Sequence, residues 1–244
     1  MDQAGHPDAL VFNLKKDSPF YFKCQVCGVC CTNKAIRISP YEALRLARNL
    51  QISTCEVYRS YAEEGGTVLR NKPDGTCVFL NLRGCGVHPD RPLVCRLFPL
   101  GQIIDSRGEP RYASMPLHPD CLGLFDTDGT VESYLEAQGT RPYFHYDHIY
   151  STLYRRISEK LSGRRAASET PDPAPGPAMK MRVPYRSGDL LSSWLDIDAA
   201  VGSYCRARRL LIPRNPEETI SLHVRALEER LAGQKTPAME PPQE

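Results

Sequence analysis

The stretch FKCQVCGVCCTN, residues 22–33, places four cysteines within eight positions, and this density constrains the fold more than any other feature. Cys24, Cys27 and Cys30 are each separated by two residues, a spacing at which tight turns can bring neighbouring sulfurs to one metal centre. Cys31 follows Cys30 directly, and adjacent side chains in extended backbone point to opposite sides. We therefore expect one sulfur of this pair to serve a first centre and the other to face a second centre or to pack.

The remaining cysteines supply candidates for distant ligands. The chain has ten cysteines, and nine of them fall between Cys24 and Cys121. Four of these lie further along the chain, in sequence rich in turn-forming residues: Cys77, Cys85, Cys95 and Cys121. With the first four they could form two four-thiolate sites. Alternatively, they could form a single cluster, with the other cysteines structural. Eight thiolates in one small domain repel one another and are costly to bury unpaired, so the pattern predicts bound cations.

The spacing also bears on the kind of metal. Three cysteines in the rhythm C-x2-C-x2-C resemble the run of bacterial ferredoxins, whose fourth ligand comes from a distance, although here Cys31 replaces the later Cys-Pro. Zinc held by four thiolates is closed and redox-silent, whereas an iron–sulfur cluster adds redox or substrate-anchoring capacity. The triplet favours an iron–sulfur cluster, of the 4Fe-4S type, over zinc.

Other candidate side chains have simpler explanations. Cys55 lies beside the start of a predicted helix and Cys205 on a predicted helical stripe, and we expect both to pack. His88 could replace one cysteine as a ligand, but a turn histidine bonded to backbone is favoured, and the same holds for His118. No catalytic residue is predicted, because the sequence has no P-loop, no G-x-S-x-G and no H-E-x-x-H.

The ends and the composition restrict the setting. The first twenty residues have no basic start followed by an apolar run, so no secretory signal is expected. No stretch of about 18 uninterrupted apolar residues exists, which predicts no membrane span. We expect a cytoplasmic protein, in which reduced thiols favour metal binding over disulfides.

Charge gives little support for a nucleic-acid or membrane partner. The formal net charge is +2, so no strong global field is expected. The basic segment CRARRLLIPR, residues 205–214, is interpreted as a solvated helix end, with contact to an acidic partner or nucleic acid as the alternative. A protein partner bound through the C-terminal helices remains a hypothesis.

Local patterns divide the chain into parts. Ser39, Pro40 and Glu42 form a capping box at the start of one predicted helix. Short apolar runs broken by Gly, Pro and Asp predict short strands and turns over residues 67–116. Further helices are expected over 53–64, 130–139, 144–161 and after Asn215. The predicted parts are an irregular lead-in (1–20), a cysteine-cluster metal-binding domain (21–162), a Pro-rich linker (163–184), a helical extension (185–233) and a disordered tail (234–244).

Two segments carry a family resemblance: FKCQVCGVCC, and further on GTCVFLNLRGCGVHPDRPLVCRLFP. Together they resemble the YkgJ-type cysteine cluster family, also called the zinc- or iron-chelating CxxCxxCC domain. Its hallmark is CxxCxxCC followed by G-C-x-V/I-H/Y-x-x-R-P-x-x-C-R-x-F-P. The match covers Phe22 to about Pro99 closely and Cys121 more loosely, and leaves the chain after Gly163 unexplained. Some relatives with the same cysteine run are similar to a flagellin lysine methylase.

These observations predict an α+β protein. It has a small, irregular, cysteine-ligated metal domain with short strands and flanking helices, plus a helical C-terminal extension. The predicted function is metal binding, with an iron–sulfur cluster favoured over zinc. A structural zinc scaffold for protein interaction and a cluster-dependent modifying enzyme are the alternatives, so the sequence leaves open whether the protein is an enzyme. The predicted metal ligands are Cys24, Cys27, Cys30, Cys31, Cys77, Cys85, Cys95 and Cys121.

Overall fold

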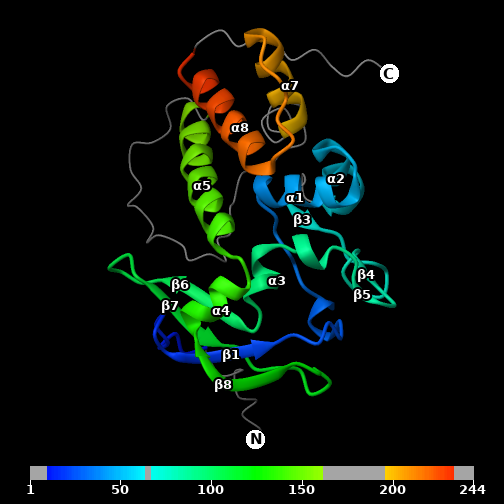
Figure 1. Ribbon diagram of the computed structural model, residues 1–244, viewed down its shortest axis with the longest axis vertical. Helices are drawn as coiled ribbons and strands as arrows, with labels where there is room; N and C mark the ends of the chain where they lie inside the picture. The colour runs from blue at the N-terminus through cyan, green and yellow to red at the C-terminus, as the bar shows by residue number, and fades with distance from the viewer. Residues whose placement is uncertain (1–9, 64–66, 162–195, 234–244) are drawn as a thin grey trace, which may run out of the picture. The chain divides into compact units, whose positions relative to one another are not determined.

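The computed structural model describes residues 10–63, 67–161 and 196–233 (Figure 1). The predicted linker and tail lie outside these residues. The described chain forms two compact units, of which the first holds 10–30 and 93–141 and the second holds the rest. Short antiparallel strands and helices occur together, which confirms the predicted α+β class.

The first unit is built on two short antiparallel ribbons (Figure 1). Strand β1 pairs with β8, a strand that closes the unit from far along the sequence. Strands β6 and β7 form a hairpin whose turn is held by the Gly108 N–H, which donates to the Asp105 carbonyl at 2.9 Å. The elements of this unit are β1 (Pro19–Lys23), α3 (Leu93–Leu97), β6 (Leu100–Ile104), β7 (Pro110–Ser114), β8 (Leu124–Thr130) and α4 (Val131–Ala137).

Aromatic side chains fill the core between β1, β8 and α4. Phe20 and Phe22 on β1 are buried, and Phe20 meets the ring of Tyr134 edge-on at 4.9 Å between centroids. Phe22 meets Phe125 of β8 at 5.3 Å. The Tyr134 hydroxyl donates to the Phe98 carbonyl at 2.8 Å and so satisfies one of the carbonyls left over at the end of α3. This core fixes the strand that leads directly into the first cysteines.

The second unit is mainly helical. Its helix α1 begins with the predicted capping box: the Ser39 N–H donates to the Glu42 carboxylate at 2.5 Å, and the Glu42 N–H donates to the Ser39 hydroxyl. Helix α8 begins at the predicted Asn215-Pro216. The elements are α1 (Pro40–Leu50), α2 (Thr54–Tyr61), β2 (Ala62–Glu63), β3 (Val68–Leu69), β4 (Leu80–Asn81), β5 (Gly84–Cys85), η3 (His88–Asp90), α5 (Arg141–Leu161, entering this unit at Pro142), α7 (Ile197–Arg208) and α8 (Pro216–Leu231).

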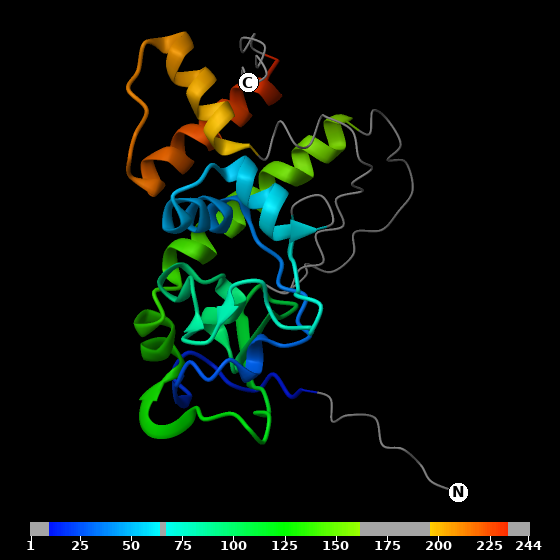
Figure 2. The same ribbon diagram turned by 90° about the vertical axis from the view of Figure 1, so that its right-hand side faces the viewer.

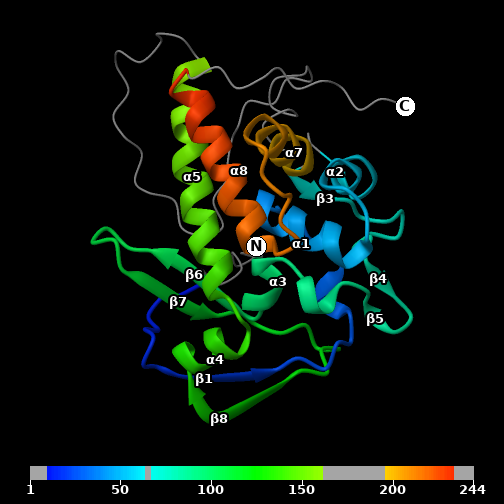
Figure 3. The same cartoon turned by 45° about the horizontal axis from the view of Figure 1, so that its top comes forward.

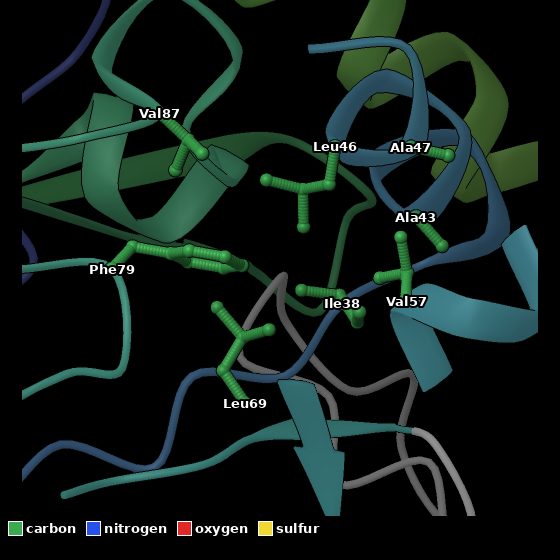
Figure 4. Packing of buried hydrophobic residues seen from close by; sticks show 8 residues of the cluster. All are labelled: Ile38, Ala43, Leu46, Ala47, Val57, Leu69, Phe79 and Val87. Carbon is green, nitrogen blue, oxygen red and sulfur yellow. The ribbon is translucent and has the colours of Figure 1, made fainter. Parts of the chain in front are cut away.

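One hydrophobic cluster joins the helices of this unit to its strands and turns (Figure 4). Leu46 of α1 and Val57 of α2 are fully buried in it, together with Leu69 of β3. Phe79 and Val87 join the cluster from the segment that carries Cys77 and Cys85, and both cysteines pack against it. The remaining members are Ile38, Ala43 and Ala47. The cysteine-bearing hairpin is therefore anchored on a core of ordinary apolar residues.

Helices α7 and α8, predicted as a separate extension, belong to the same compact unit as α1 and α2. They follow one another as a helical pair (Figure 2), and α8 lies beside α5 (Figure 3). The Tyr41 hydroxyl on α1 donates to the Glu217 carboxylate of α8 at 2.9 Å. The division into compact units therefore differs from the predicted domain boundaries. The reason is that α7 and α8 bury their apolar stripes against the N-terminal half of the chain. Among the described helices, none has the length and apolar character needed to cross a bilayer.

Asp198 of α7 provides the first testable contact. Its carboxylate accepts the Thr54 N–H at the start of α2, at 2.7 Å, and an Arg48 N–H at 3.0 Å. Replacing Asp198 with Ala leaves the buried Thr54 donor without this acceptor, so we expect the free energy of unfolding to fall by about 2 kcal/mol. Urea unfolding followed by circular dichroism measures this loss. The exposed Glu228→Ala variant is the control and should stay within about 0.5 kcal/mol; equal effects of the two variants would contradict the assignment.

Candidate metal centre

The first cysteine loop has the backbone geometry of a thiolate-binding turn. The Val26 N–H donates to the Cys24 sulfur at 3.3 Å, and the Val29 N–H donates to the Cys27 sulfur, in each case from two residues further along. Such N–H groups soften the charge of a metal-bound thiolate. Val26 has φ 54° and Gly28 has φ 80°. A β-branched residue in this left-handed region is strained by about 1–3 kcal/mol, so the loop is held in its conformation by its surroundings.

Strand pairing explains how Cys121 reaches this loop. In the β1–β8 ladder, Lys23 lies opposite Leu124 and Phe22 lies opposite Phe125. Cys24 therefore leaves β1 at the same end of the ladder at which the chain from Cys121 enters β8. The ladder places two parts of the sequence together that are separated by most of the domain.

Cys27 and Cys121 are in direct contact through their thiols. Burial acts to raise the pKa of Cys27, but N–H groups of Leu122 and Val29 and the Cys121 thiol outweigh it, and the pKa falls below its ordinary value. Burial raises the pKa of Cys121; the Gly123 N–H opposes this, and the nearby Cys27 adds to it. Within the pair the Cys121 thiol is the donor and the Cys27 sulfur is the acceptor. Cys30 lies close enough to act on both sulfurs electrostatically.

The adjacent cysteines fall on the two sides of the division between the units. The first stretch of the first unit ends at Cys30, and the first stretch of the second unit begins at Cys31. The Cys77 N–H donates to the Cys31 carbonyl at 2.8 Å, and Thr32 and Thr76 form a bridge next to it. Cys31 is thus tied to the second unit by backbone pairing.

Cys85 is joined to the same local structure. It pairs with Leu80 in the β4–β5 hairpin, and the Leu80 N–H donates to the Cys77 carbonyl at 2.9 Å. The backbone thereby links Cys31, Cys77 and Cys85 through a short series of hydrogen bonds. The predicted ligands divide into two sets by unit: Cys24, Cys27, Cys30, Cys95 and Cys121 in the first, and Cys31, Cys77 and Cys85 in the second.

Cys95 lies on the short helix α3 of the first unit. Its neighbour Arg96 is buried, and the guanidinium donates to the Gln138 carbonyl at 2.8 Å. This contact ties α3 to the end of α4. Arg96 therefore supports the position of the cysteine-bearing helix within the unit.

The structure gives other contacts to Cys55, Cys205, His88 and His118, the side chains for which simpler explanations were expected. An Arg91 N–H lies 3.3 Å from His88 Nδ1, and the same guanidinium donates to the His88 carbonyl at 2.7 Å. His118 Nδ1 accepts the Asp120 N–H at 3.2 Å. Cys55 lies on α2, and Cys205 is buried on α7 and donates toward the Leu211 carbonyl.

All ten cysteines are thiols rather than disulfides. Within the described ranges, no three cysteine, histidine or carboxylate side chains are gathered in a group that could hold an ion. Cys27 and Cys121 do lie in contact, with Cys30 nearby. The donor chemistry nevertheless fits a thiophilic metal, because the sulfurs of Cys24, Cys27 and Cys121 each accept the N–H of the residue two positions on. An all-sulfur set of this kind suits zinc or iron–sulfur and does not suit Mg²⁺ or Ca²⁺.

Sequence reasoning identified these cysteines but missed what positions them. It placed residues 1–20 in an irregular lead-in and predicted no strand over 124–130. The structure has β1 over Pro19–Lys23, which begins within the last two residues of that lead-in, and β8 over Leu124–Thr130. The alternation of buried Phe20 and Phe22 with outward neighbours was the available signal for β1.

Comparison with known proteins adds the family. Residues 23–113 match the family model described as "CxxCxxCC: Putative zinc- or iron-chelating domain". The chain is also 30% identical over 116 residues to the archaeal protein named "Uncharacterized protein MJ0661" of Methanocaldococcus jannaschii. That alignment covers 46% of this chain and 62% of the relative, so it spans less than two thirds of the relative's length. No solved structure matches the chain. Over residues 23–113 the chain is therefore similar to the CxxCxxCC zinc- or iron-chelating family, and the rest of the chain lies outside that match.

Proposed function

We propose that the protein binds an iron–sulfur cluster of the 4Fe-4S type through cysteines of the first unit. Cys24, Cys27, Cys30 and Cys121 would be its ligands. The observation that carries the proposal is the contact between Cys27 and Cys121, which brings a distant sulfur to the C-x2-C-x2-C run. This is the arrangement of a triplet completed by a remote cysteine.

The backbone donors support the same assignment. The N–H groups of Val26, Val29 and Gly123 each donate to a cysteine sulfur, and Leu122 adds a further N–H to Cys27. Hydrogen bonds to cluster sulfurs are among the features that set a reduction potential. When bound, the cluster would supply one-electron redox capacity or an anchoring point for a substrate. Because ligand thiols must stay reduced, the proposal also places the protein in a reducing compartment, the cytoplasm.

The second set, Cys31, Cys77 and Cys85, is proposed to hold a separate metal. Its support is the backbone hydrogen bonding that joins these three positions around the β4–β5 hairpin. With two centres, the adjacent Cys30 and Cys31, which lie in the short 3-10 helix Val29–Cys31, would serve different metals.

Metal analysis of cysteine variants tests the proposal. Protein purified without oxygen should contain iron and inorganic sulfide and absorb in the visible range. Cys27→Ser and Cys121→Ser should each lose most of that iron and sulfide. Cys55→Ser is the matched control, because its thiol lies on α2 away from the cysteine run in sequence, and it should keep the wild-type content.

Three results would separate the possibilities. Zinc without sulfide in a colourless protein would overturn the iron–sulfur assignment and leave metal binding intact. Equal loss of metal in Cys55→Ser and Cys27→Ser would overturn the assignment of ligands. Unchanged iron and sulfide in both Cys27→Ser and Cys121→Ser would place the cluster on other residues.

A further inference from the structure

Two surface segments expose apolar side chains and carry opposite charges. The first, called the arginine loop, is residues 205–216, from the last turn of α7 to the first residue of α8. Its Leu210, Leu211 and Ile212 are 47%, 93% and 59% exposed. The second, called the acidic face, is residues 120–136, from Asp120 through β8 and α4. These two segments hold six of the ten exposed large apolar side chains in the described part of the chain, so exposure is concentrated there.

The arginine loop is basic and held in place. Residues 205–216 contain four arginines and no carboxylate. Arg208 is engaged with Glu229 and stacks on the Tyr204 ring. Arg209 and Arg214 have no ion-pair partner among the residues that the structure describes. Two arginines thus flank the three apolar side chains with their charge available.

Hydrogen bonds fix the loop in this conformation. The Leu210 N–H donates to the Cys205 carbonyl at 2.9 Å, and the Cys205 thiol donates toward the Leu211 carbonyl. The Thr219 hydroxyl lies 3.4 Å from the Pro213 carbonyl. A loop that is ordered before it binds loses less conformational entropy on association. The exposed side chains of Leu210, Leu211 and Ile212 are therefore already ordered for contact with a partner.

The acidic face has the complementary character. Residues 112–140 contain five carboxylates and neither lysine nor arginine. Within this stretch Leu122, Leu124 and Phe125 are 65%, 61% and 51% exposed, between Asp120 and the carboxylates of β8. The neighbouring N-terminal segment brings two cations near it: Lys16 lies 4.0 Å from Glu132, and Lys23 is paired opposite Leu124.

We propose that the arginine loop of one molecule docks on the acidic face of a second copy of this chain. Leu210, Leu211 and Ile212 would cover the apolar side chains of the acidic face, and Arg209 and Arg214 would face its carboxylates. Exposed apolar side chains grouped within a polar rim mark interaction sites, and opposite charges orient the encounter. The contact joins different surfaces of the two copies, so it closes into a reciprocal pair about a two-fold axis or continues as a chain.

Charge-reversal variants and their mixture test this proposal. The wild-type chain should associate reversibly in sedimentation velocity, more strongly at low salt. Arg209→Glu with Arg214→Glu should give a monomer, because two acidic surfaces then meet. Asp128→Lys with Glu136→Lys should also give a monomer, because both surfaces are then basic. A mixture of these two variants should associate again. The acidic loop of the first variant then meets the basic face of the second, and the basic loop of the second meets the acidic face of the first.

Several outcomes would overturn the proposal. A wild-type chain that stays monomeric at every concentration and ionic strength would do so. So would a mixture in which both charge variants remain monomeric. Leu211→Asp changes a side chain that is 93% exposed, so the variant should fold normally, and circular dichroism checks this. Wild-type association of a folded Leu211→Asp variant would place the contact elsewhere.

Discussion

Removing the metal is expected to unfold the ribbons of the first unit while the helices of the second unit stay protected. In hydrogen exchange, amides of β1 and β8 should lose protection by about 10³-fold, which corresponds to about 4 kcal/mol. Amides of α8 should change little, because that helix buries Ile220, Leu227 and Leu231 in its own unit. Metal chelation under reducing conditions, followed by exchange and mass spectrometry, measures both regions in one experiment.

The physical reason is that the first unit has a small aromatic core and ribbons that add little stability of their own. Its sheets are two-stranded, and an isolated two-stranded ribbon is marginal in water. The cysteine loop adds cost, because Val26 is held at φ 54°. Free energy of structural metal binding acts as folding free energy, about 10–16 kcal/mol for zinc in small peptides. Losing the metal therefore removes the interaction that compensates the strained loop.

Two controls make the result interpretable. Cys55→Ser should respond to chelation as the wild type does, because Cys55 lies outside the predicted ligand set. Cys27→Ser should already show low protection in β1 and β8 and change little on chelation. If metal-free wild type kept full protection in both strands, the metal would not be a structural element of this unit.

The sequence predicted local structure well where the signal is local. Ser39, Pro40 and Glu42 specify the start of α1 within four residues, and Asn215-Pro216 specifies the start of α8. The β1–β8 ladder was missed because its two strands are far apart and β8 reads as a turn, with Asp126, Asp128 and Gly129 inside LFDTDGT. Turn residues within a strand are tolerated here because Phe20 and Phe22 of the partner strand supply the buried face.

The grouping of the cysteines has the same limit. The spacing of Cys24, Cys27 and Cys30 is readable, but the approach of Cys121 depends on the β1–β8 register, which no local pattern encodes. The assignment of α7 and α8 to the second unit likewise depends on long-range partners such as Asp198 with Thr54. The metal-binding chemistry was predictable from the residue types, whereas the tertiary structure was needed to see which residues contact one another.

A second large effect is expected in the core of the second unit, at His223. This side chain on α8 is fully buried, and its Nδ1 lies 2.7 Å from the Tyr150 hydroxyl of α5. Burial raises the pKa of Tyr150 well above its ordinary value, so the phenol stays protonated and can donate to the ring. Replacing His223 with Ala removes the acceptor and leaves a cavity. We expect the free energy of unfolding to fall by about 3–5 kcal/mol in urea titrations followed by circular dichroism.

Variants of the two stacked tyrosines separate hydrogen bonding from packing. Tyr150→Phe removes only the donor and should cost about 1–2 kcal/mol. Tyr154→Phe is the matched control, because its hydroxyl is buried with no hydrogen-bond partner among the described residues, and its loss should be neutral or stabilising. His223→Leu keeps most of the volume without an acceptor, and combining it with Tyr150→Phe should cost less than the sum of the two single variants. Additive losses, or equal losses for Tyr150→Phe and Tyr154→Phe, would show that the hydrogen bond between α5 and α8 does not stabilise this core.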